Sequence, residues 1–183
     1  MNPATANPAT ALAEIAQVLA AVPDLPSRLA GLLGAPCVLI YGQGRTGLAL
    51  RALAMRLGQM GRDAHFLLDT APKPLRPGDL FLVNASRGDL ASAVALLHRA
   101  RAVGARTAVI TAVTAGPALD AADEVLHLPA ETWSTLAPGQ SVLALGGQYE
   151  LALWLLGDLA VELLMRTHGV SPETLAAGHV NLG

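Results

Sequence analysis

The stretch IYGQGRTGLAL, residues 40–50, decides the fold that we expect for this chain. It closes the apolar run CVLIY and places Gly42, Gly44 and Gly47 in the spacing G-x-G-x-x-G. Glycines at these positions let a buried strand turn sharply into a helix whose first backbone N–H groups face a phosphate. The spacing leaves open whether the ligand is a dinucleotide or a smaller phosphate compound.

On either side of this turn, short apolar segments alternate with longer helical ones. Strands are expected within residues 37–41, 63–69, 78–86, 105–113 and 124–129. Helices are expected within residues 11–22, 24–34, 45–61 and 90–104, then as one long helix after residue 147 and a short last helix from residue 171. This alternation predicts an α/β fold, a three-layer α/β/α sandwich around a five-stranded, mostly parallel sheet, with N-terminal helices and a long C-terminal helix.

The composition favours a single domain that associates with copies of itself. Of the 183 residues, 52% are hydrophobic and 14% are charged, which gives more apolar surface than a small monomer needs to bury. We expect a flexible lead-in at residues 1–8, where NPAT is repeated, and one domain over residues 9–183. That domain divides into helices at 9–34, a core at 35–170 and a tail at 171–183.

Charge and cysteine content exclude several classes of protein. A formal net charge of −2 gives no general attraction to nucleic acid or to an anionic membrane. The longest apolar run carries Asp158 and Glu162, which is unfavourable in lipid, so we expect no membrane span. No signal-peptide pattern opens the sequence, which favours the cytoplasm. The single cysteine, Cys37, excludes an internal disulfide and a cysteine-based metal cluster.

Two junctions between a strand and a helix carry polar side chains. The first contains Gly44, Arg45 and Thr46, and the second contains Ser86 and Arg87. In a parallel sheet such junctions lie at the carboxyl ends of the strands, where ligands bind. Hydroxyls, backbone amides and an arginine suit a phosphate group better than an apolar ring. We therefore expect these five residues to bind the phosphate of a small ligand.

A dinucleotide site is the competing interpretation of the same glycines. Asp69 ends the second strand about 22 residues after Gly47, near the position of an acid that would bind a ribose. Against this interpretation, Arg45 and Thr46 occupy positions between the glycines that usually hold small or apolar residues. No separate substrate domain fits within 183 residues, and an arginine beside a hydroxyl suits a phosphate monoester better.

Four segments together resemble the sugar isomerase (SIS) domain family, in particular its 6-phospho-3-hexuloisomerase branch. The segments are VLIYGQGRTGLALRALAMRLGQMG, PGDLFLVNASRGDLASAVALLHRARAVGARTAVIT, GGQYELALWLLGDLAVELLMRTHGVS and GHVNLG. They are similar to the family's G-x-G-R-S-G turn and helix, its serine loop, its G-S-x-F-E helix and its H-x-N-L-E tail. The resemblance covers roughly residues 35–183.

The resemblance implies an enzyme that converts D-arabino-3-hexulose 6-phosphate into fructose 6-phosphate without a metal or an organic cofactor. It implies a homo-oligomer, with a tetramer favoured and a dimer possible, whose active sites lie between subunits. Arg45, Thr46 and Ser86 match residues that meet the substrate phosphate. Glu150 matches the acid of the F-E motif, and His179 matches a tail histidine that reaches a neighbouring subunit's site. These last two are the candidate proton carriers.

The chemistry of such an isomerisation requires groups of this kind. A base removes a proton beside a carbonyl and returns it one carbon away, while another group exchanges protons with the oxygens. A carboxylate and an imidazole suit these two tasks. The alternative for Glu150 is that an acid in the first turn of a helix complements the helix dipole. The remaining histidines lack the spacing of a helical metal site, and we expect them to be structural or exposed: His65, His98, His127 and His168.

The loop at residues 84–89 departs from the family pattern. Where the family typically shows S-G-S-G-E-T or S-G-S-G-E-S, this chain has Asn84, Ala85, Ser86, Arg87, Gly88 and Asp89. Asp89 brings a negative charge to the expected phosphate site, and Arg87 can offset it by pairing with the phosphate or with Asp89. A second hypothesis therefore stands beside the isomerase: a protein that binds a sugar phosphate as a sensor, without chemistry.

Overall fold

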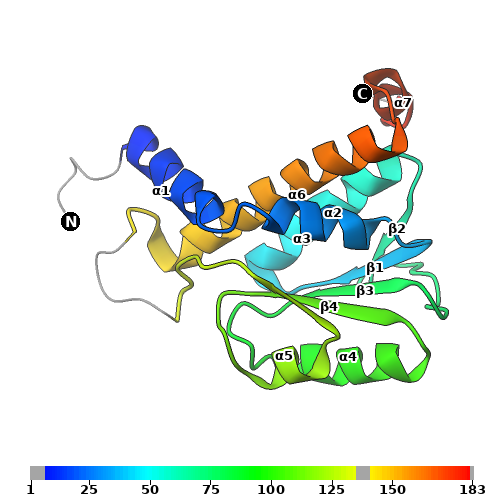
Figure 1. Ribbon diagram of the computed structural model, residues 1–183, viewed down its shortest axis with the longest axis horizontal. Helices are drawn as coiled ribbons and strands as arrows, with labels where there is room; N and C mark the ends of the chain where they lie inside the picture. Colours follow the sequence, from blue (N-terminus) through cyan, green and yellow to red (C-terminus); the bar gives the residue numbers. More distant parts are fainter. Residues whose placement is uncertain (1–6, 135–140, 182–183) are drawn as a thin grey trace.

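Five parallel strands form the centre of the computed structural model, which describes residues 7–134 and 141–181 (Figure 1). They are β1 (Cys37–Tyr41), β2 (Asp63–Phe66), β3 (Leu80–Asn84), β4 (Arg106–Thr111) and β5 (Glu124–His127). The order across the sheet is β2-β1-β3-β4-β5. In register, Val38 of β1 lies between Ala64 of β2 and Leu80 of β3. The expected five-stranded parallel sheet is confirmed.

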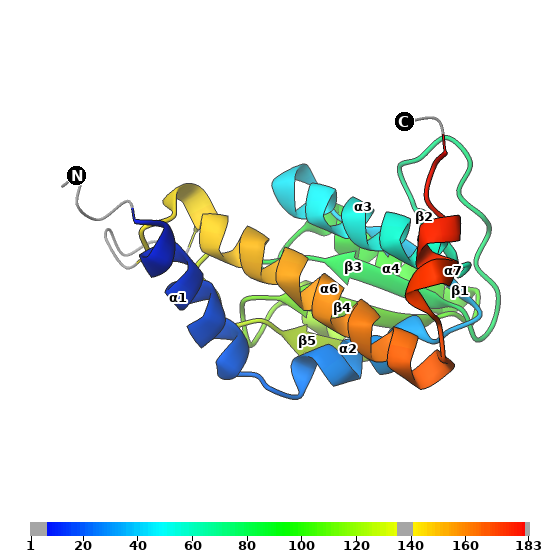
Figure 2. The ribbon, with the colours of Figure 1, turned by 90° about the horizontal axis from the view of Figure 1, so that it is seen from above.

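Helices cover both faces of the sheet, which confirms the three-layer sandwich (Figures 1 and 2). One face packs against α2 (Leu25–Leu33), α3 (Gly44–Gln59) and α6 (Gly147–His168), and the other against α4 (Ala91–Ala102) and α5 (Pro117–Ala121). The alternation within β1 explains this division, since Ile40 belongs to the first core and Leu39 to the second. Among the described residues, no helix is both long and apolar enough to cross a bilayer.

The outer helices α1 (Pro8–Ala20) and α7 (Pro172–Ala177) begin with side-chain caps. Asn7 accepts a hydrogen bond from the amide of Ala9, and Ser171 accepts one from the amide of Thr174. Of the expected lead-in at 1–8, residues 1–6 lie outside the described part of the chain. Strand β2 ends at Phe66, three residues earlier than expected, and the short helix α5 was not anticipated.

Helix α1 also fixes the turn that leads into α6. The carboxylate of Glu14 accepts hydrogen bonds from the hydroxyl of Ser141 at 2.6 Å and from the backbone amide of Val142 at 3.0 Å. These bonds satisfy polar groups of a turn that would otherwise lack partners. The start of the longest helix is therefore tied to the first helix of the chain.

The opening glycines bring the end of β1 into direct contact with the first turn of α3. A Cβ atom on Gly47 would lie 2.6 Å from the carbonyl oxygen of Gly42 and 2.9 Å from its carbonyl carbon. Gly44, which begins the helix, has a φ of +57°, a conformation that favours glycine. Glycine is thus needed at position 47 for close packing and at position 44 for backbone conformation.

The close contact at Gly47 predicts opposite effects of two alanine substitutions in α3. Gly47→Ala should lower the free energy of unfolding by about 1–3 kcal/mol, because backbone must shift to admit the methyl group. Gly58→Ala should raise it by about 0.5–1 kcal/mol, because nothing lies within 4 Å of the added Cβ and alanine favours a helix. Denaturant unfolding of both variants measures the difference, and equal effects would contradict the packing constraint.

Candidate functional site

A cleft opens where the connections from the two central strands diverge. Strand β1 continues into α3 on one face of the sheet, and its neighbour β3 continues into α4 on the other. Ligands of open α/β sheets bind in such a crevice at the carboxyl ends of the strands. The cavity has a volume of about 440 Å³ and is lined by the residues after β1, the residues after β3, Trp133 and Glu150. This size suits a small ligand.

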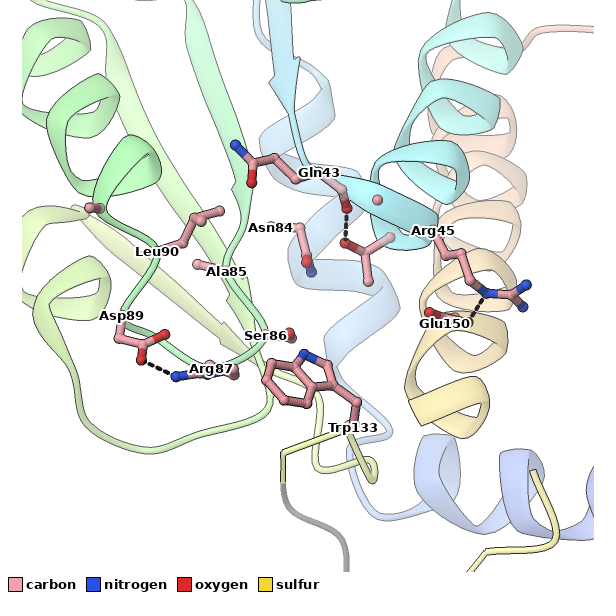
Figure 3. A pocket seen from close by; sticks show the side chains of 13 residues that line it. Gln43, Arg45, Asn84, Ala85, Ser86, Arg87, Asp89, Leu90, Trp133 and Glu150 are labelled. Atoms are coloured by element: carbon pink, nitrogen blue, oxygen red, sulfur yellow. Dashed lines mark hydrogen bonds and ion pairs between the residues drawn. The ribbon is translucent and has the colours of Figure 1, made fainter. Parts of the chain in front are cut away.

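One wall of the cleft holds an ion pair between the first turns of α3 and α6 (Figure 3). The Nε of Arg45 donates to Glu150 Oε2 at 2.5 Å. The Arg45 side chain is 73% exposed and that of Glu150 only 17%. Thr46 donates its hydroxyl proton to the carbonyl of Gln43 at 2.9 Å, so this hydroxyl is bonded to the N-cap residue of α3. The structure therefore brings Arg45 and Glu150, distant in sequence, into one site.

The loop after β3 forms the opposite wall. Arg87 donates to the carboxylate of Asp89 at 2.6 Å, and both side chains are about half exposed. Ser86 lines the cleft beside them, and its carbonyl accepts from the amide of Ala112 at 3.0 Å. Asp89 does not cap α4, because Leu90 occupies the N-cap position and no side chain among the described residues caps the helix. Arg87 therefore pairs with Asp89, which the sequence already indicated beside the phosphate as a partner for this arginine.

Sequence reasoning missed Trp133 and Gln43, which both line the cleft. The ring of Trp133 lies 4.9 Å from the guanidinium carbon of Arg87, a cation–π contact. Gln43 donates to the hydroxyl of Tyr41 at 2.6 Å. The sequence offered a signal for Gln43, because this residue lies between Gly42 and Gly44 of the glycine turn. Trp133 gave no signal, because the segment before α6 has no pattern of its own.

Beneath the cleft, Asn84, which lines it, is hydrogen-bonded to the buried Tyr149. The amide of Asn84 donates to the Tyr149 hydroxyl at 2.7 Å and to the carbonyl of Ile110 at 3.3 Å. Tyr149 is 1% exposed, and this burial raises the pKa of its phenol. The bond joins the end of β3 to the residue beside Glu150, so it positions that carboxylate over the sheet.

Two predicted site residues lie outside this cleft. His179 lies with Arg56, Gln59 and Leu175 beside α7, and its Nδ1 is 2.9 Å from the carbonyl oxygen of Val180. The structure therefore does not bring His179 to Glu150 of its own chain. Asp69 pairs with Arg51 at 3.1 Å and does not line the cleft, which removes the main support for a ribose site there.

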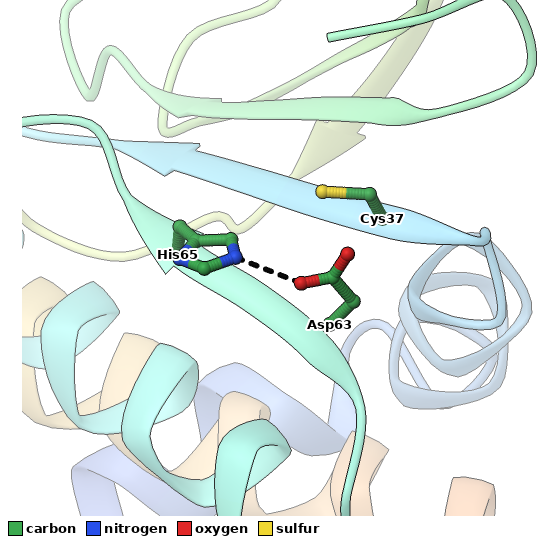
Figure 4. Close-up of side chains that lie close together, drawn as sticks. All are labelled: Cys37, Asp63 and His65. Carbon is green, nitrogen blue, oxygen red and sulfur yellow. Dashed lines mark hydrogen bonds and ion pairs between the residues drawn. The ribbon is translucent and has the colours of Figure 1, made fainter. Parts of the chain in front are cut away.

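A second polar cluster lies at the amino ends of β1 and β2 (Figure 4). The ligand atoms of Cys37, Asp63 and His65 lie within 4.8 Å of one another, so the cluster brings the single cysteine beside a histidine. Lys73 already supplies a positive charge, since its ammonium donates to both oxygens of Asp63 at 2.9 and 3.0 Å. Burial and the neighbouring acids Asp63 and Asp79 raise the pKa of the Cys37 thiol to about 11. The cluster is organised as an ion pair beside a protonated thiol.

The Asp63 ion pair predicts a dependence of stability on pH. Hydrogen bonds from Lys73, and next from His65, lower the pKa of Asp63 below its ordinary 3.8. A lowered pKa in the folded state means that stability is present above pH 3.8 and is lost as pH falls through the folded pKa. The stability difference between the wild type and Asp63→Asn should therefore be constant near neutrality and shrink below pH 4, as measured by urea unfolding.

A Lys73→Gln background gives the control for this prediction. Asp63→Asn should cost less stability at pH 7 in that background, because the main partner of the carboxylate is already gone. An equal cost in both backgrounds would mean that Lys73 does not stabilise Asp63.

Comparison with known proteins gives relatives that match most of the chain. A 3-hexulose-6-phosphate isomerase of Mycobacterium gastri is 32% identical over 145 residues, which cover 79% of this chain and 73% of that protein. A 3-hexulose-6-phosphate isomerase of Bacillus subtilis (strain 168) is 28% identical over 161 residues, which cover 82% of each. No family model matches the chain.

The same fold occurs in a solved structure from Methanococcus jannaschii. The TM-score is 0.81 at 19% identity, with 95% of this chain and 97% of that chain covered. The description of that crystal structure infers a molecular function of 3-hexulose-6-phosphate isomerase for its protein. At this identity the likeness establishes the fold, and the Mycobacterium relative establishes the family. The resemblance seen in the sequence is confirmed: the chain belongs to the sugar isomerase domain family, near its hexulose-phosphate isomerase branch.

Proposed function

We propose that this protein is a phosphosugar isomerase of the 3-hexulose-6-phosphate type, which moves a carbonyl group between neighbouring carbons of a sugar phosphate. The observation that carries the proposal is Glu150. Its carboxylate lies in a cleft at the carboxyl ends of the strands, 17% exposed and fixed by Arg45. Arginines and helix starts on both walls suit the phosphate end of the substrate.

In the proposed reaction Glu150 acts as the base. Oε2 holds the bond to Arg45, and within the described residues no partner binds Oε1, which leaves this oxygen for a substrate. Oε1 removes the proton from C2 of the 3-hexulose phosphate, and an enediolate forms across C2 and C3. The protonated carboxyl, which can exchange its proton with solvent, returns a proton to C3, while the hydroxyl proton moves from O2 to O3. The carbonyl is then at C2, as in fructose 6-phosphate, and no redox change occurs.

The proposal includes an oligomer in which subunits complete each other's sites, in the cytoplasm. Large apolar side chains are exposed along the outer faces of α3 and α6: Leu48, Met55, Leu151, Trp154, Leu155 and Leu159. Exposed apolar side chains on neighbouring helices favour contact with a second copy. His179 lies away from the cleft of its own chain. In the proposed assembly, a homotetramer by preference, it acts in the cleft of a neighbour.

Replacing the proposed base tests the reaction. Glu150→Gln should lower kcat by about 100-fold or more while the variant still binds fructose 6-phosphate, because only proton transfer is removed. The measurements are conversion of fructose 6-phosphate and NMR detection of solvent deuterium at C2 and C3. Glu162→Gln is the matched control, because Glu162 lies on the same helix and pairs with Arg166 at 2.9 Å outside the cleft.

Three outcomes would contradict the isomerase. Unchanged deuterium exchange in Glu150→Gln would remove Glu150 from the reaction. Binding of fructose 6-phosphate by the wild type without turnover or exchange would favour the sugar-phosphate sensor, which the altered loop at Arg87 and Asp89 supports. Thermal stabilisation by NAD and not by sugar phosphates would favour a dinucleotide site.

Mixing two inactive variants tests whether sites are shared between subunits. Glu150→Gln and His179→Ala should each be inactive alone, but co-refolded chains should regain activity. Random pairing leaves one intact site in every mixed pair, so about a quarter of wild-type activity is expected. Full activity of His179→Ala alone would exclude His179 from the reaction. Failure of the mixture to recover would contradict a site shared between subunits.

A further inference from the structure

We infer that Arg87, held by the indole of Trp133, is the residue that anchors the substrate phosphate, whereas Arg45 remains the ionic partner of Glu150. This inference rests on the proposed function and divides two tasks that the sequence assigns to both arginines. It makes Trp133 a positioning residue, because Trp133 acts on the phosphate through Arg87. Figure 3 shows the two arginines on opposite walls, with Trp133 beside Arg87.

Arg45 is the less available of the two cations. Its partner Glu150 is 17% exposed, so removing the guanidinium would leave a carboxylate with little access to water. An enclosed charge that loses its partner is strongly disfavoured. The bond to Glu150 uses Nε of Arg45, and Figure 3 shows the terminal nitrogens of Arg45 pointing away from the wall that holds Arg87 and Trp133. Turning them toward a phosphate between the two walls would disturb the bond that orients the proposed base.

Arg87 is released more easily. Its partner Asp89 is 50% exposed and lies only two residues away on the same loop, so the carboxylate can become hydrated when the pair separates. Exposed pairs of this kind contribute little to stability. A phosphate dianion carries more charge than one carboxylate and accepts the two parallel hydrogen bonds that a guanidinium offers. Exchange of Asp89 for phosphate is thus favourable.

The loop that carries Arg87 is held rigidly by backbone bonds. The amide of Gly88 donates to the carbonyl of Ala85 at 2.8 Å, and the carbonyl of Gly88 accepts from Ala118 at 2.9 Å. A Cβ at Gly88 would lie 2.8 Å from Val113. Because this turn cannot move freely, the position of the guanidinium depends on the side chain of Arg87 and on the ring that it contacts.

Trp133 supplies that ring from a segment fixed to the start of α6. The amide of Tyr149 donates to the carbonyl of Glu131 at 3.2 Å, and a Cβ on Gly146 would lie 2.7 Å from the amide nitrogen of Trp133. The indole face attracts a cation whether or not Asp89 is bound. Trp133 therefore keeps the guanidinium in the cleft after Asp89 leaves, close to the uncapped start of α4.

Tryptophan fluorescence tests the inference without requiring turnover. The chain has two tryptophans, and Trp154→Phe leaves Trp133 as the reporter. In this background, fructose 6-phosphate and inorganic phosphate at constant ionic strength should change the emission saturably. Arg87→Gln should weaken binding about tenfold or more, whereas Arg45→Gln should weaken it less than about threefold. Arg99→Gln, an exposed arginine outside the cleft, controls for the loss of one charge.

Kinetics and conservative variants separate positioning from structural roles. Arg87→Gln should raise KM with little change in kcat, and Arg45→Gln should lower kcat with little change in KM. By calorimetry, Trp133→Phe should keep most of the affinity that Trp133→Leu loses. Loss of ligand binding in Arg87→Gln, in a protein without turnover, would support the anchor and reject the isomerase. Normal KM in Arg87→Gln with raised KM in Arg45→Gln, or no binding by the wild type, would overturn the inference.

Discussion

The rest of the structure depends on a reversal of strand order: β2 lies on one side of β1, whereas β3 and the strands after it lie on the other. Strands β1 and β3 pair side by side, but their helices leave toward opposite faces of the sheet. The backbone connections must therefore separate at this point, and no helix covers the carboxyl ends of the two strands. The walls of the cleft, the bond between Asn84 and Tyr149 beneath it, and the placement of Glu150 all follow from that separation.

The electrostatics of the cleft are those of two separate ion pairs. Arg45 pairs with Glu150, and Arg87 pairs with Asp89, so the unliganded cleft has two cations and two anions in balance. The pairs differ in access to water, and in our inference this difference decides which pair a phosphate opens. A loop that is rich in glycine and serine can bind phosphate through backbone amides and hydroxyls. In this chain, we infer, an arginine side chain takes over part of that task.

The sequence predicted the fold well because the fold depends on short-range patterns. Apolar runs that end in glycine turns define the strands, and their alternation with helices limits the topology to a parallel sheet. It also named Arg45, Glu150 and Arg87 as candidate site residues, and the structure brings these residues into one cleft. It did not predict Trp133 or the contact of Arg45 with Glu150, since both depend on how the segment before α6 packs onto the sheet. The neighbouring subunit that we propose for His179 lies outside a single chain altogether.

The bond between Glu14 and the turn at Ser141 and Val142 changes what counts as the smallest functional unit. The family motifs in the sequence begin near residue 35 and by themselves give the preceding helices no role, although the likeness to the Methanococcus jannaschii structure covers 95% of the chain. However, α1 holds the turn from which α6 starts, and α6 carries Glu150 in its first turn. A shortened protein that begins at β1 would keep every cleft residue while losing the brace that orients one of them. The first helix thus supports the geometry of the candidate site, although none of its residues lines the cleft.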